Sequence, residues 1–271
     1  MGIRLIATDL DGTIVRSDHR TLSPRTRAAF AAAREAGLVV VAISGRQPYS
    51  IGAIVAGTAL DGLTIGSNGS VAVDLRERSI LFEELIEVDA QWALATQMLE
   101  AFPDARVVSV RDGGNSYVAQ HGYVGERDPG AEDARWLVTH RETSLAEVLE
   151  VPSVKLVVRD PGTTPEELLA VSRELAVPGV HPTISGAPFL EVARSGVSKA
   201  SALARVAARL GIDASEVIAF GDNTNDVEML TWAGTGVAMA NATASALAAA
   251  DEVTLGNDAD GVAVVIERLL G

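Results

Sequence analysis

Two aspartates, Asp9 and Asp11, directly follow the apolar run 3–8, and Gly12 closes that stretch. A run of this length that ends at a glycine predicts a buried parallel strand followed by a tight loop. Ligands of open α/β sheets bind just beyond the carboxyl ends of the strands, so both carboxylates are expected where chemistry occurs. Two positions apart on an extended chain, they would repel each other unless a divalent cation such as Mg²⁺ lay between them. The alternative is an Asx-turn that only caps the next element.

Three further motifs lie far from these aspartates in the sequence. The triplet 44–46 (Ser-Gly-Arg) follows the apolar run 38–43, and the acid-rich loop 221–226 follows the apolar run 217–220. Lys199 opens an Ala-rich helix, which is unusual because a cation at a helix N-terminus opposes the helix dipole. An isolated lysine there would be a solvated surface residue, but the surrounding acids favour a catalytic role.

These residue types fit transfer of a phosphoryl group. A carboxylate such as that of Asp9 can attack phosphorus and split one hard displacement into two easier ones. Mg²⁺ on one side and an ammonium on the other can neutralise the negative charges of nucleophile and substrate. Ser44 and adjacent backbone N–H groups can hold the remaining phosphate oxygens. Asp11 can protonate the leaving alcohol and then activate water.

The elements that position these motifs form a βαβ unit. Ser23 and Pro24 predict the start of a helix over 25–36, and Gly37 predicts its end. The strand 38–43 then lies parallel to the first strand. The same pattern of continuous apolar strands alternating with helices returns after residue 193. We therefore predict an α/β fold, with a Rossmann-like, mainly parallel sheet and helices on both of its faces.

Between these two stretches the pattern changes to short strands mixed with helices, which favours an inserted α+β domain with an antiparallel sheet. The expected division is a discontinuous core, 1–83 with 193–271, and an insert, 84–192. Strand pairs are predicted at 106–110 with 115–120 and at 180–184 with 189–193, whereas 121–150 is polar and suggests only short helices. Asn68-Gly69 is interpreted as a simple turn.

Composition narrows the classes of function. The chain has 271 residues, a formal net charge of −14 and no cysteine. Because no segment collects lysines and arginines into a basic patch, nucleic acid and anionic membranes are poor partners. Disulfides, thiolate zinc sites and a cysteine nucleophile are excluded. No apolar run reaches the length of a membrane span, and no leader is evident, so a cytoplasmic protein is expected.

Taken together, these motifs resemble the haloacid dehalogenase-like (HAD) phosphatases, in the Cof-type branch with a large α/β cap. The motifs that carry this resemblance are 9–13 (Asp-Leu-Asp-Gly-Thr), 44–46, Lys199 and 221–226 (Gly-Asp-Asn-Thr-Asn-Asp), with the tails 236–242 and 257–262. The resemblance covers the core at both ends, while the insert matches by position and length.

The resemblance implies a role for each position. Asp9 would be the nucleophile and a Mg²⁺ ligand, and Asp11 the general acid/base that also offers its backbone carbonyl to the metal. The phosphate-binding residues would be Ser44, Gly45, Lys199 and Asn225. Asp222 would complete the metal ligands, and Asp226 would orient its neighbours.

The expected activity is Mg²⁺-dependent hydrolysis of a small phosphorylated metabolite, such as a sugar phosphate, through an aspartyl-phosphate. A phosphotransferase or phosphomutase on the same core is the near alternative. A receiver-like signalling module that holds a phospho-aspartate is a distant one, because the gap from Ser44 to Lys199 and the acid at Asp11 do not suit it. A monomer or homodimer is expected.

The insert would cover the site and select the leaving group. Its candidate selectors, together with Arg46 of the core, are the turn 111–115 and the loop 185–189, although an ordinary loop residue is the stronger interpretation at each of these positions. His121, His140 and His181 match no metal-ligand spacing and are interpreted as structural or surface residues.

Overall fold

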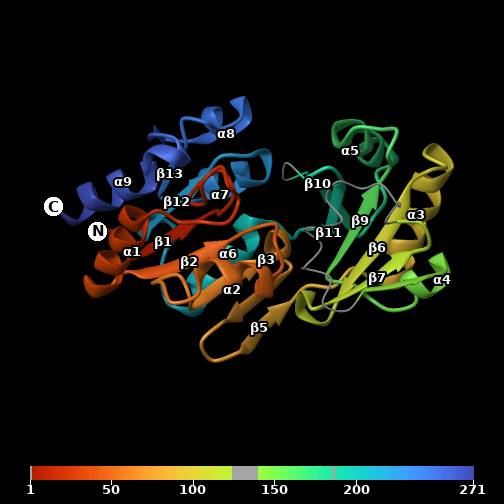
Figure 1. The fold of residues 1–271 in the computed structure, drawn as a ribbon, viewed down its shortest axis with the longest axis horizontal. Helices are drawn as coiled ribbons and strands as arrows, with labels where there is room; N and C mark the ends of the chain where they lie inside the picture. Colours follow the sequence, from red (N-terminus) through yellow and green to blue (C-terminus); the bar gives the residue numbers. More distant parts are fainter. Residues whose placement is uncertain (1, 124–139, 185–186) are drawn as a thin grey trace. The chain divides into compact units, whose positions relative to one another are not determined.

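The computed structural model describes residues 2–123, 140–184 and 187–271. Its described residues form two compact units (Figure 1). Unit 1 comprises Met1–Phe82 and Ser198–Gly271, and unit 2 comprises Glu83–Val197. Among the described residues, no helix is both long enough and apolar enough to cross a membrane.

Unit 1 is built on an eight-stranded sheet with the order β14-β13-β12-β1-β2-β3-β4-β5. The strands from β14 to β3 are parallel, and β4 pairs with β3 in the antiparallel direction. Their bounds are β1 (Leu5–Thr8), β2 (Val39–Ile43), β3 (Leu63–Gly66), β4 (Val71–Asp74), β5 (Ser79–Glu83), β12 (Val217–Gly221), β13 (Thr235–Ala238) and β14 (Glu252–Val253). The predicted α/β class and mainly parallel sheet are confirmed.

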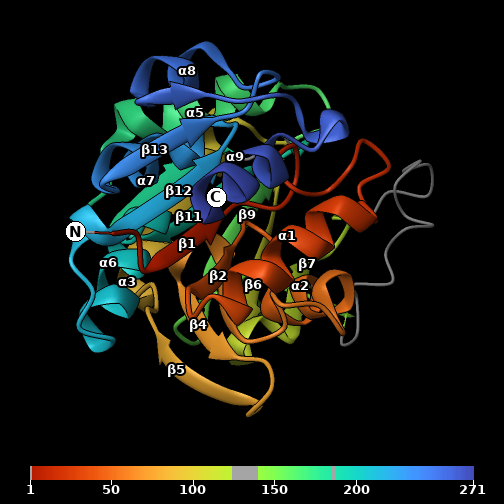
Figure 2. The same cartoon turned by 90° about the vertical axis from the view of Figure 1, so that its left-hand side faces the viewer.

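Helices cover both faces of this sheet, as Figure 2 shows in a view along the molecule. Alternate residues of β1 point to opposite faces, so Ile6 packs in one buried cluster and Leu5 in the other. The cluster around Ile6 includes side chains of α1 (Pro24–Glu35), α2 (Pro48–Val55) and α9 (Gly261–Leu270). The cluster around Leu5 includes side chains of α6 (Lys199–Arg209) and α7 (Val227–Trp232). A further short helix, α8 (Ala244–Ala249), follows β13.

The start and end of α1 follow the signals in the sequence. The Ser23 side chain caps the helix by accepting a hydrogen bond from the backbone N–H of Thr26, and Pro24 occupies the first turn. Gly37 adopts a positive φ of 87° directly after the helix. The predicted strands 3–8, 38–43 and 217–220 agree with β1, β2 and β12 to within two residues at each end.

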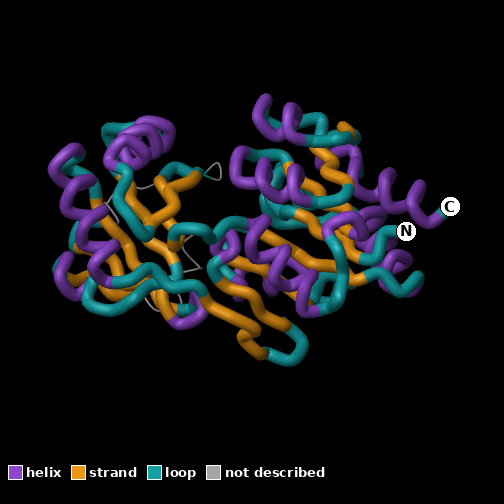
Figure 3. The backbone as a smooth tube through the Cα atoms, turned by 180° about the vertical axis from the view of Figure 1, so that it is seen from behind, coloured by secondary structure: helices purple, strands orange, loops and turns teal. Residues whose placement is uncertain are grey.

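Unit 2 contains a six-stranded sheet with the order β10-β11-β9-β6-β7-β8. Helices α3 (Val88–Ala101), α4 (Leu145–Val148) and α5 (Pro165–Leu175) share one apolar cluster with this sheet. Figure 3 shows the helices in purple and the strands in orange. The strands are β6 (Arg106–Arg111), β7 (Ser116–Gln120), β8 (His140–Thr143), β9 (Lys155–Arg159), β10 (Val180–Thr183) and β11 (Leu190–Arg194). Neighbouring strands are antiparallel except β7 and β8, which are parallel.

The stretch 121–150 was predicted to hold only short helices. In its described part it holds the strand β8 as well as the short helix α4. The strand was missed because its four residues, His140–Thr143, are polar or charged and show no apolar alternation. Residues 124–139 of this stretch, and positions 185–186 of the predicted selector loop, lie outside the described residues.

Candidate active site

The chemistry-bearing residues of unit 1 gather at the carboxyl ends of three adjacent strands. Asp9 follows β1, and its backbone N–H donates to the carbonyl of Phe220 in β12 at 2.9 Å. Ser44 follows β2, which pairs with β1 on the other side. Asp222 follows β12. The parallel register therefore brings together three loops that are far apart in the sequence.

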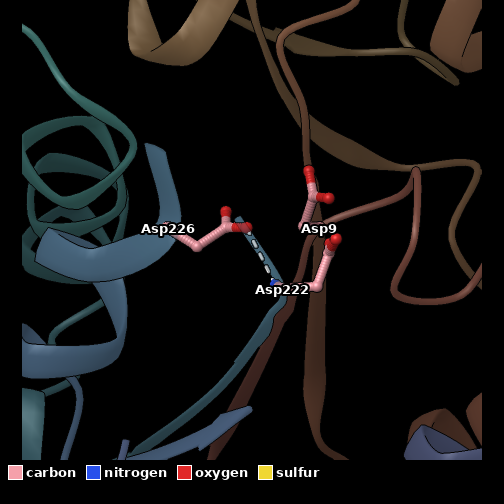
Figure 4. Close-up of side chains that lie close together, drawn as sticks. All are labelled: Asp9, Asp222 and Asp226. Carbon is pink, nitrogen blue, oxygen red and sulfur yellow. Dashed lines mark hydrogen bonds between the residues drawn. The ribbon is translucent and has the colours of Figure 1, made fainter. Parts of the chain in front are cut away.

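Three carboxylates meet at this edge. Asp9, Asp222 and Asp226 each offer an oxygen, and these oxygens all lie within 4.8 Å of one another. Figure 4 shows the carboxylates of Asp9 and Asp222 side by side and the carboxylate of Asp226 directed toward them. Asp9 and Asp226 are buried, with exposures of 4% and 0%, and Asp222 is partly buried.

The ammonium of Lys199 lies among these carboxylates. Its Nζ donates to Asp9 Oδ1 and to Asp226 Oδ1, both at 2.6 Å, and the residue is only 1% exposed. Ser198 caps α6, so Lys199 occupies the first position of that helix. Its ammonium is therefore a buried bridge between two acids, and the alternative of a solvated surface lysine is wrong.

Both carboxylate oxygens of Asp226 are used within the protein. Oδ1 accepts from Lys199, and Oδ2 accepts from the backbone N–H groups of Asp222 and Asn223, each at 3.0 Å (Figure 4). Asp226 thus fixes both the ammonium and the loop that carries Asp222. This geometry suits the orienting role that the family resemblance implies for Asp226.

Asp222 is held against the loop that follows β1. Thr13 Oγ1 donates to Asp222 Oδ1 at 2.8 Å. Gly12 has a φ of 78°, and a Cβ at this position would lie 2.3 Å from Asp222 Oδ2. Only a glycine permits both this backbone conformation and this close approach. Gly12 and Thr13 of the first motif therefore allow the loop 221–226 to pack closely against the loop after β1.

Asp11 stands apart from the three-carboxylate cluster. The guanidinium of Arg46 donates two hydrogen bonds to it, from Nε to Oδ2 at 2.6 Å and from a terminal nitrogen to Oδ1 at 2.5 Å. Arg46 was predicted as a possible selector of the leaving group. In this structure its partner is Asp11, and this hydrogen bond raises the pKa of the guanidinium further.

Burial and the charges of neighbouring acids raise the pKa values of Asp9 and Asp222. Burial is the largest influence on Asp9, whose pKa lies well above its ordinary value although Lys199 opposes the shift. Burial, together with the negative charge of Asp226, raises the pKa of Asp222 to about 6. For Lys199, burial lowers the pKa, but Asp226 and Asp9 outweigh it and the net direction is upward.

The cluster contains three carboxylates and one ammonium, so it carries an excess of negative charge when ionised. A divalent cation would relieve this excess, and closely spaced carboxylate oxygens are the ligands that hard cations prefer. Asn225 Oδ1 is also buried and has no donor among the described residues. The site is therefore suited to a metal ion with its bound waters.

The phosphate-binding residues predicted from the sequence lie around this cluster on different loops. Ser44 is buried, and its Oγ accepts from the backbone N–H of Arg46 at 3.1 Å, across the partly exposed Gly45. Asn225 Nδ2 donates to Asn68 Oδ1 at 2.9 Å. Asn68 does lie in a turn, with a φ of 55°, but its buried side chain also joins the site.

Two asparagines that were not singled out for a role brace the loop after β1. Asn241 Nδ2 donates to the carbonyl of Gly12 at 2.8 Å, and Asn257 Nδ2 donates to the carbonyl of Val15 at 2.9 Å. The two are linked, because Asn241 Oδ1 accepts from the backbone N–H of Asn257. The tails 236–242 and 257–262 carried these residues, but neither tail indicated the contact with the first loop.

The candidate selectors in the insert belong to unit 2. The Arg111 guanidinium donates to the carbonyls of Glu147 and Val148, at 2.7 and 2.9 Å, and so binds the end of α4. This is a structural role within its own unit. His121 is exposed, and His181 lies partly exposed on β10. No metal-ligand cluster includes either histidine among the described residues.

Comparison with known proteins identifies the family. The model of the haloacid dehalogenase-like hydrolases (Hydrolase_3) matches residues 6–266. The chain belongs to this family. The predicted HAD resemblance and the predicted enzyme class, a HAD-type phosphatase, are thereby confirmed.

Two curated bacterial relatives align over nearly the whole chain. The 5-amino-6-(5-phospho-D-ribitylamino)uracil phosphatase YcsE of Bacillus subtilis is 31% identical, over 98% of this chain and 95% of the relative. The pyridoxal phosphate phosphatase YbhA of Escherichia coli is 30% identical, over 98% of each chain. The crystal structure of SMU.1108c from Streptococcus mutans shares the fold, with a TM-score of 0.87, 22% identity and 99% coverage of both chains.

Proposed function

We propose that this HAD phosphatase is a Mg²⁺-dependent phosphomonoesterase that hydrolyses a small phosphorylated metabolite, such as a sugar phosphate, through a phosphorylated Asp9. The observation that carries this proposal is the buried constellation of Asp9, Lys199 and Asp226 beside Asp222. Asp9 Oδ1 lies 2.6 Å from an ammonium that also contacts Asp226, so the carboxylate is held in place at the end of a rigid strand.

In the first step, a carboxylate oxygen of Asp9 attacks phosphorus, and the bond between phosphorus and the leaving oxygen breaks. Asp11, which enters this step as the carboxylic acid, gives its proton to that oxygen and becomes a carboxylate, so the product leaves as a neutral alcohol. In the second step, Asp11 takes a proton from water while the water oxygen attacks phosphorus. The bond between phosphorus and Asp9 then breaks, so Asp9 is again a carboxylate and Asp11 is again a carboxylic acid.

Residues around Asp9 would hold the phosphoryl oxygens during both steps. We assign this role to Ser44, Gly45, Lys199 and Asn225. Lys199 offers the buried positive charge, while Ser44 and the backbone near Gly45 offer neutral donors. Such donors lose less energy to reorganisation than water does, because the protein holds them in place before the reaction.

The proposed ligands of Mg²⁺ are the carboxylates of Asp9 and Asp222 and the backbone carbonyl of Asp11. When bound, the ion would offset the negative charges of the carboxylates and the phosphate. Asp226 is a poor direct ligand, because Lys199 and two backbone N–H groups already bind both of its oxygens. We therefore assign Asp226 to holding Lys199 and the loop of Asp222 in place, and not to binding the metal directly.

We further propose that the insert, predicted at 84–192, is a cap that selects the leaving group. The two relatives described above are named for different substrates, a pyridoxal phosphate and a ribitylamino-uracil phosphate. Both are small phosphorylated metabolites, which supports a substrate of that class here. The oligomeric state that we propose remains a monomer or a homodimer.

The test is phosphate release from a panel of phosphorylated metabolites by the wild type and by Asp9→Asn. We expect turnover by the variant to fall by at least roughly 10⁴-fold, as for other removed nucleophiles, with an unchanged circular dichroism spectrum. Excess EDTA should silence the wild type, and added Mg²⁺ should restore it. Wild-type rates in D9N would refute the assignment of the nucleophile. Transfer to added sugars in place of phosphate release would identify a phosphotransferase.

A further inference from the structure

The ion pair between Arg46 and Asp11 has a geometry that fixes both side chains. Two parallel hydrogen bonds, of 2.6 and 2.5 Å, join the planar guanidinium to the planar carboxylate. A two-point contact of this kind sets the orientation of the carboxylate as well as its distance. The terminal nitrogen that contacts Asp11 also donates to the carbonyl of His19 at 3.1 Å.

Arg46 is itself anchored through its backbone. Its N–H donates to Ser44 Oγ at 3.1 Å, and its carbonyl accepts from the backbone N–H of Ser67 at 2.9 Å. The side chain therefore extends from a fixed point on the loop after β2 to the loop after β1. These two loops follow adjacent parallel strands. The ion pair thus ties one loop of the site to the next.

The same contact keeps Asp11 separate from the other acids. The clustered carboxylate oxygens are those of Asp9, Asp222 and Asp226, and Asp11 is not among them. The side chains of Arg46 and Asp11 are 28% and 32% exposed, whereas that of Asp9 is 6% exposed. Asp11 therefore stands nearer to solvent, with a cation of its own, and Lys199 serves the buried cluster.

We propose that Arg46 is a positioning residue that holds the Asp11 carboxylate in the place from which it transfers protons. This inference rests on the proposed function, in which Asp11 protonates the leaving oxygen and later deprotonates water. Arg46 acts through Asp11 and makes no contribution of its own to binding the phosphate or the leaving group. The rival role, direct contact with the substrate, predicts different kinetics.

The kinetic test compares two substrates, an alkyl phosphate that the wild type hydrolyses and 4-nitrophenyl phosphate. Nitrophenolate is a stable leaving group and needs little help from an acid. General acid catalysis contributes roughly 10² to 10⁴-fold, so Arg46→Ala should lower kcat/KM about 10²-fold for the alkyl phosphate but less than about 5-fold for the nitrophenyl ester. The ratio kcat/KM reports the steps up to departure of the leaving group, so the hydrolysis of phosphorylated Asp9, which both substrates share, does not enter it. Equal losses of kcat/KM on both substrates would overturn the proposal.

A double variant sharpens this test. If Arg46 acts only through Asp11, adding Arg46→Ala to Asp11→Asn should change kcat by less than about 3-fold, because coupled residues are not additive. Multiplied losses would show that Arg46 contacts the substrate itself. Arg46→Lys keeps the charge but not the two-point contact, so its loss on the alkyl phosphate should fall between those of the wild type and R46A.

Arg16→Ala is the matched control. Arg16 lies in the same loop as Asp11, but its ion-pair partner is Asp260, at 3.7 Å. In R16A, the ratio of the two substrates' kcat/KM values should match the wild-type ratio. A shift of that ratio as large as in R46A would mean that loss of another arginine near Asp11 has the same effect, and it would overturn the specific role of Arg46.

Crystal structures of the wild type and R46A give a readout that is independent of activity. We expect the Asp11 carboxylate to leave its wild-type position in R46A while Asp9 and Lys199 stay in place. An Asp11 side chain that does not move would overturn the proposal even in an active enzyme. Conversely, a wild type that hydrolyses no phosphate ester would refute the proposed function, and these structures would still decide whether Arg46 positions Asp11.

Discussion

Replacing Lys199 with methionine should destabilise the protein strongly, because two buried acids then lose their shared cation. Lys199 is 1% exposed and donates to Asp9 and Asp226 at 2.6 Å. Removing one partner of a buried ion pair costs about 3–5 kcal/mol, since the remaining charge is desolvated and unpaired. For a unit of this size each kcal/mol lowers Tm by about 2–4 °C, so a drop of about 6–20 °C is expected.

The loss in K199M should depend on pH in a defined direction. Removal of the ammonium raises further the pKa of Asp9, which burial already holds above its ordinary value. An acid with a raised native pKa stabilises the fold at low pH, and this contribution is lost as pH rises through that pKa. The wild-type lysine, whose pKa is itself raised, stays charged throughout this range. The deficit of K199M should therefore be largest near pH 8 and smallest near pH 5.

The assay is urea and thermal unfolding in EDTA at both pH values. Arg25→Met is the control for an exposed pair, because Arg25 and Glu267 are 48% and 47% exposed and solvent screens their attraction, so they should contribute far less than the buried pairs of Lys199. Adding Asp226→Asn to K199M should recover part of the lost stability. A deficit in K199M as small as that of R25M, or one that is equal at pH 5 and pH 8, would refute the reasoning.

Two further predictions concern the loop after β1 and the metal. Gly12→Ala should lower the free energy of unfolding by about 2–5 kcal/mol and abolish activity, because the positive φ and the 2.3 Å approach to Asp222 both penalise a Cβ. Gly37→Ala is the control in the same unfolding assay, because Gly37 also has a positive φ, 87°, but has open space around its Cβ position. Equal losses of stability in the two variants would contradict the clash with Asp222. Mg²⁺ affinity, measured by calorimetry, should fall by at least about tenfold per pH unit below the Asp222 pKa of about 6, because protons also compete for Asp9, whose pKa is raised as well. An affinity that stays constant from pH 7 to pH 5 would contradict the proposed carboxylate ligands.

The parallel core was predictable because each of its signals is local. A capping serine with a following proline marks the start of α1, Gly37 marks its end, and continuous apolar runs mark β1, β2 and β12. Parallel strands are buried on both faces, so such runs stand out in a sequence. The strand β8 has no such signal, because its residues are polar or charged.

The members of the site were predictable, but their pairings were not. Acids and a lysine at strand and helix ends indicate a common edge, whereas a hydrogen bond between distant side chains leaves no trace in spacing. Asn68 and Asn225 are 157 residues apart, and Asn241 reaches Gly12 across 229 residues. Arg46 shows the same limit, because its position suited a selector of the leaving group until the structure placed it on Asp11.

The partners of the four acids explain how similar side chains can have different tasks. Asp226 has both oxygens bound by Lys199 and by backbone N–H groups, which leaves it a supporting role. Asp11 is held by Arg46 outside the cluster and is partly exposed, which suits its proposed role in proton transfer. Asp9 and Asp222 are then the acids left for the roles that we propose, the nucleophile and a ligand of the metal. The different proposed roles of these four aspartates therefore follow from the hydrogen bonds that each one makes, and not from the residue type, which is the same.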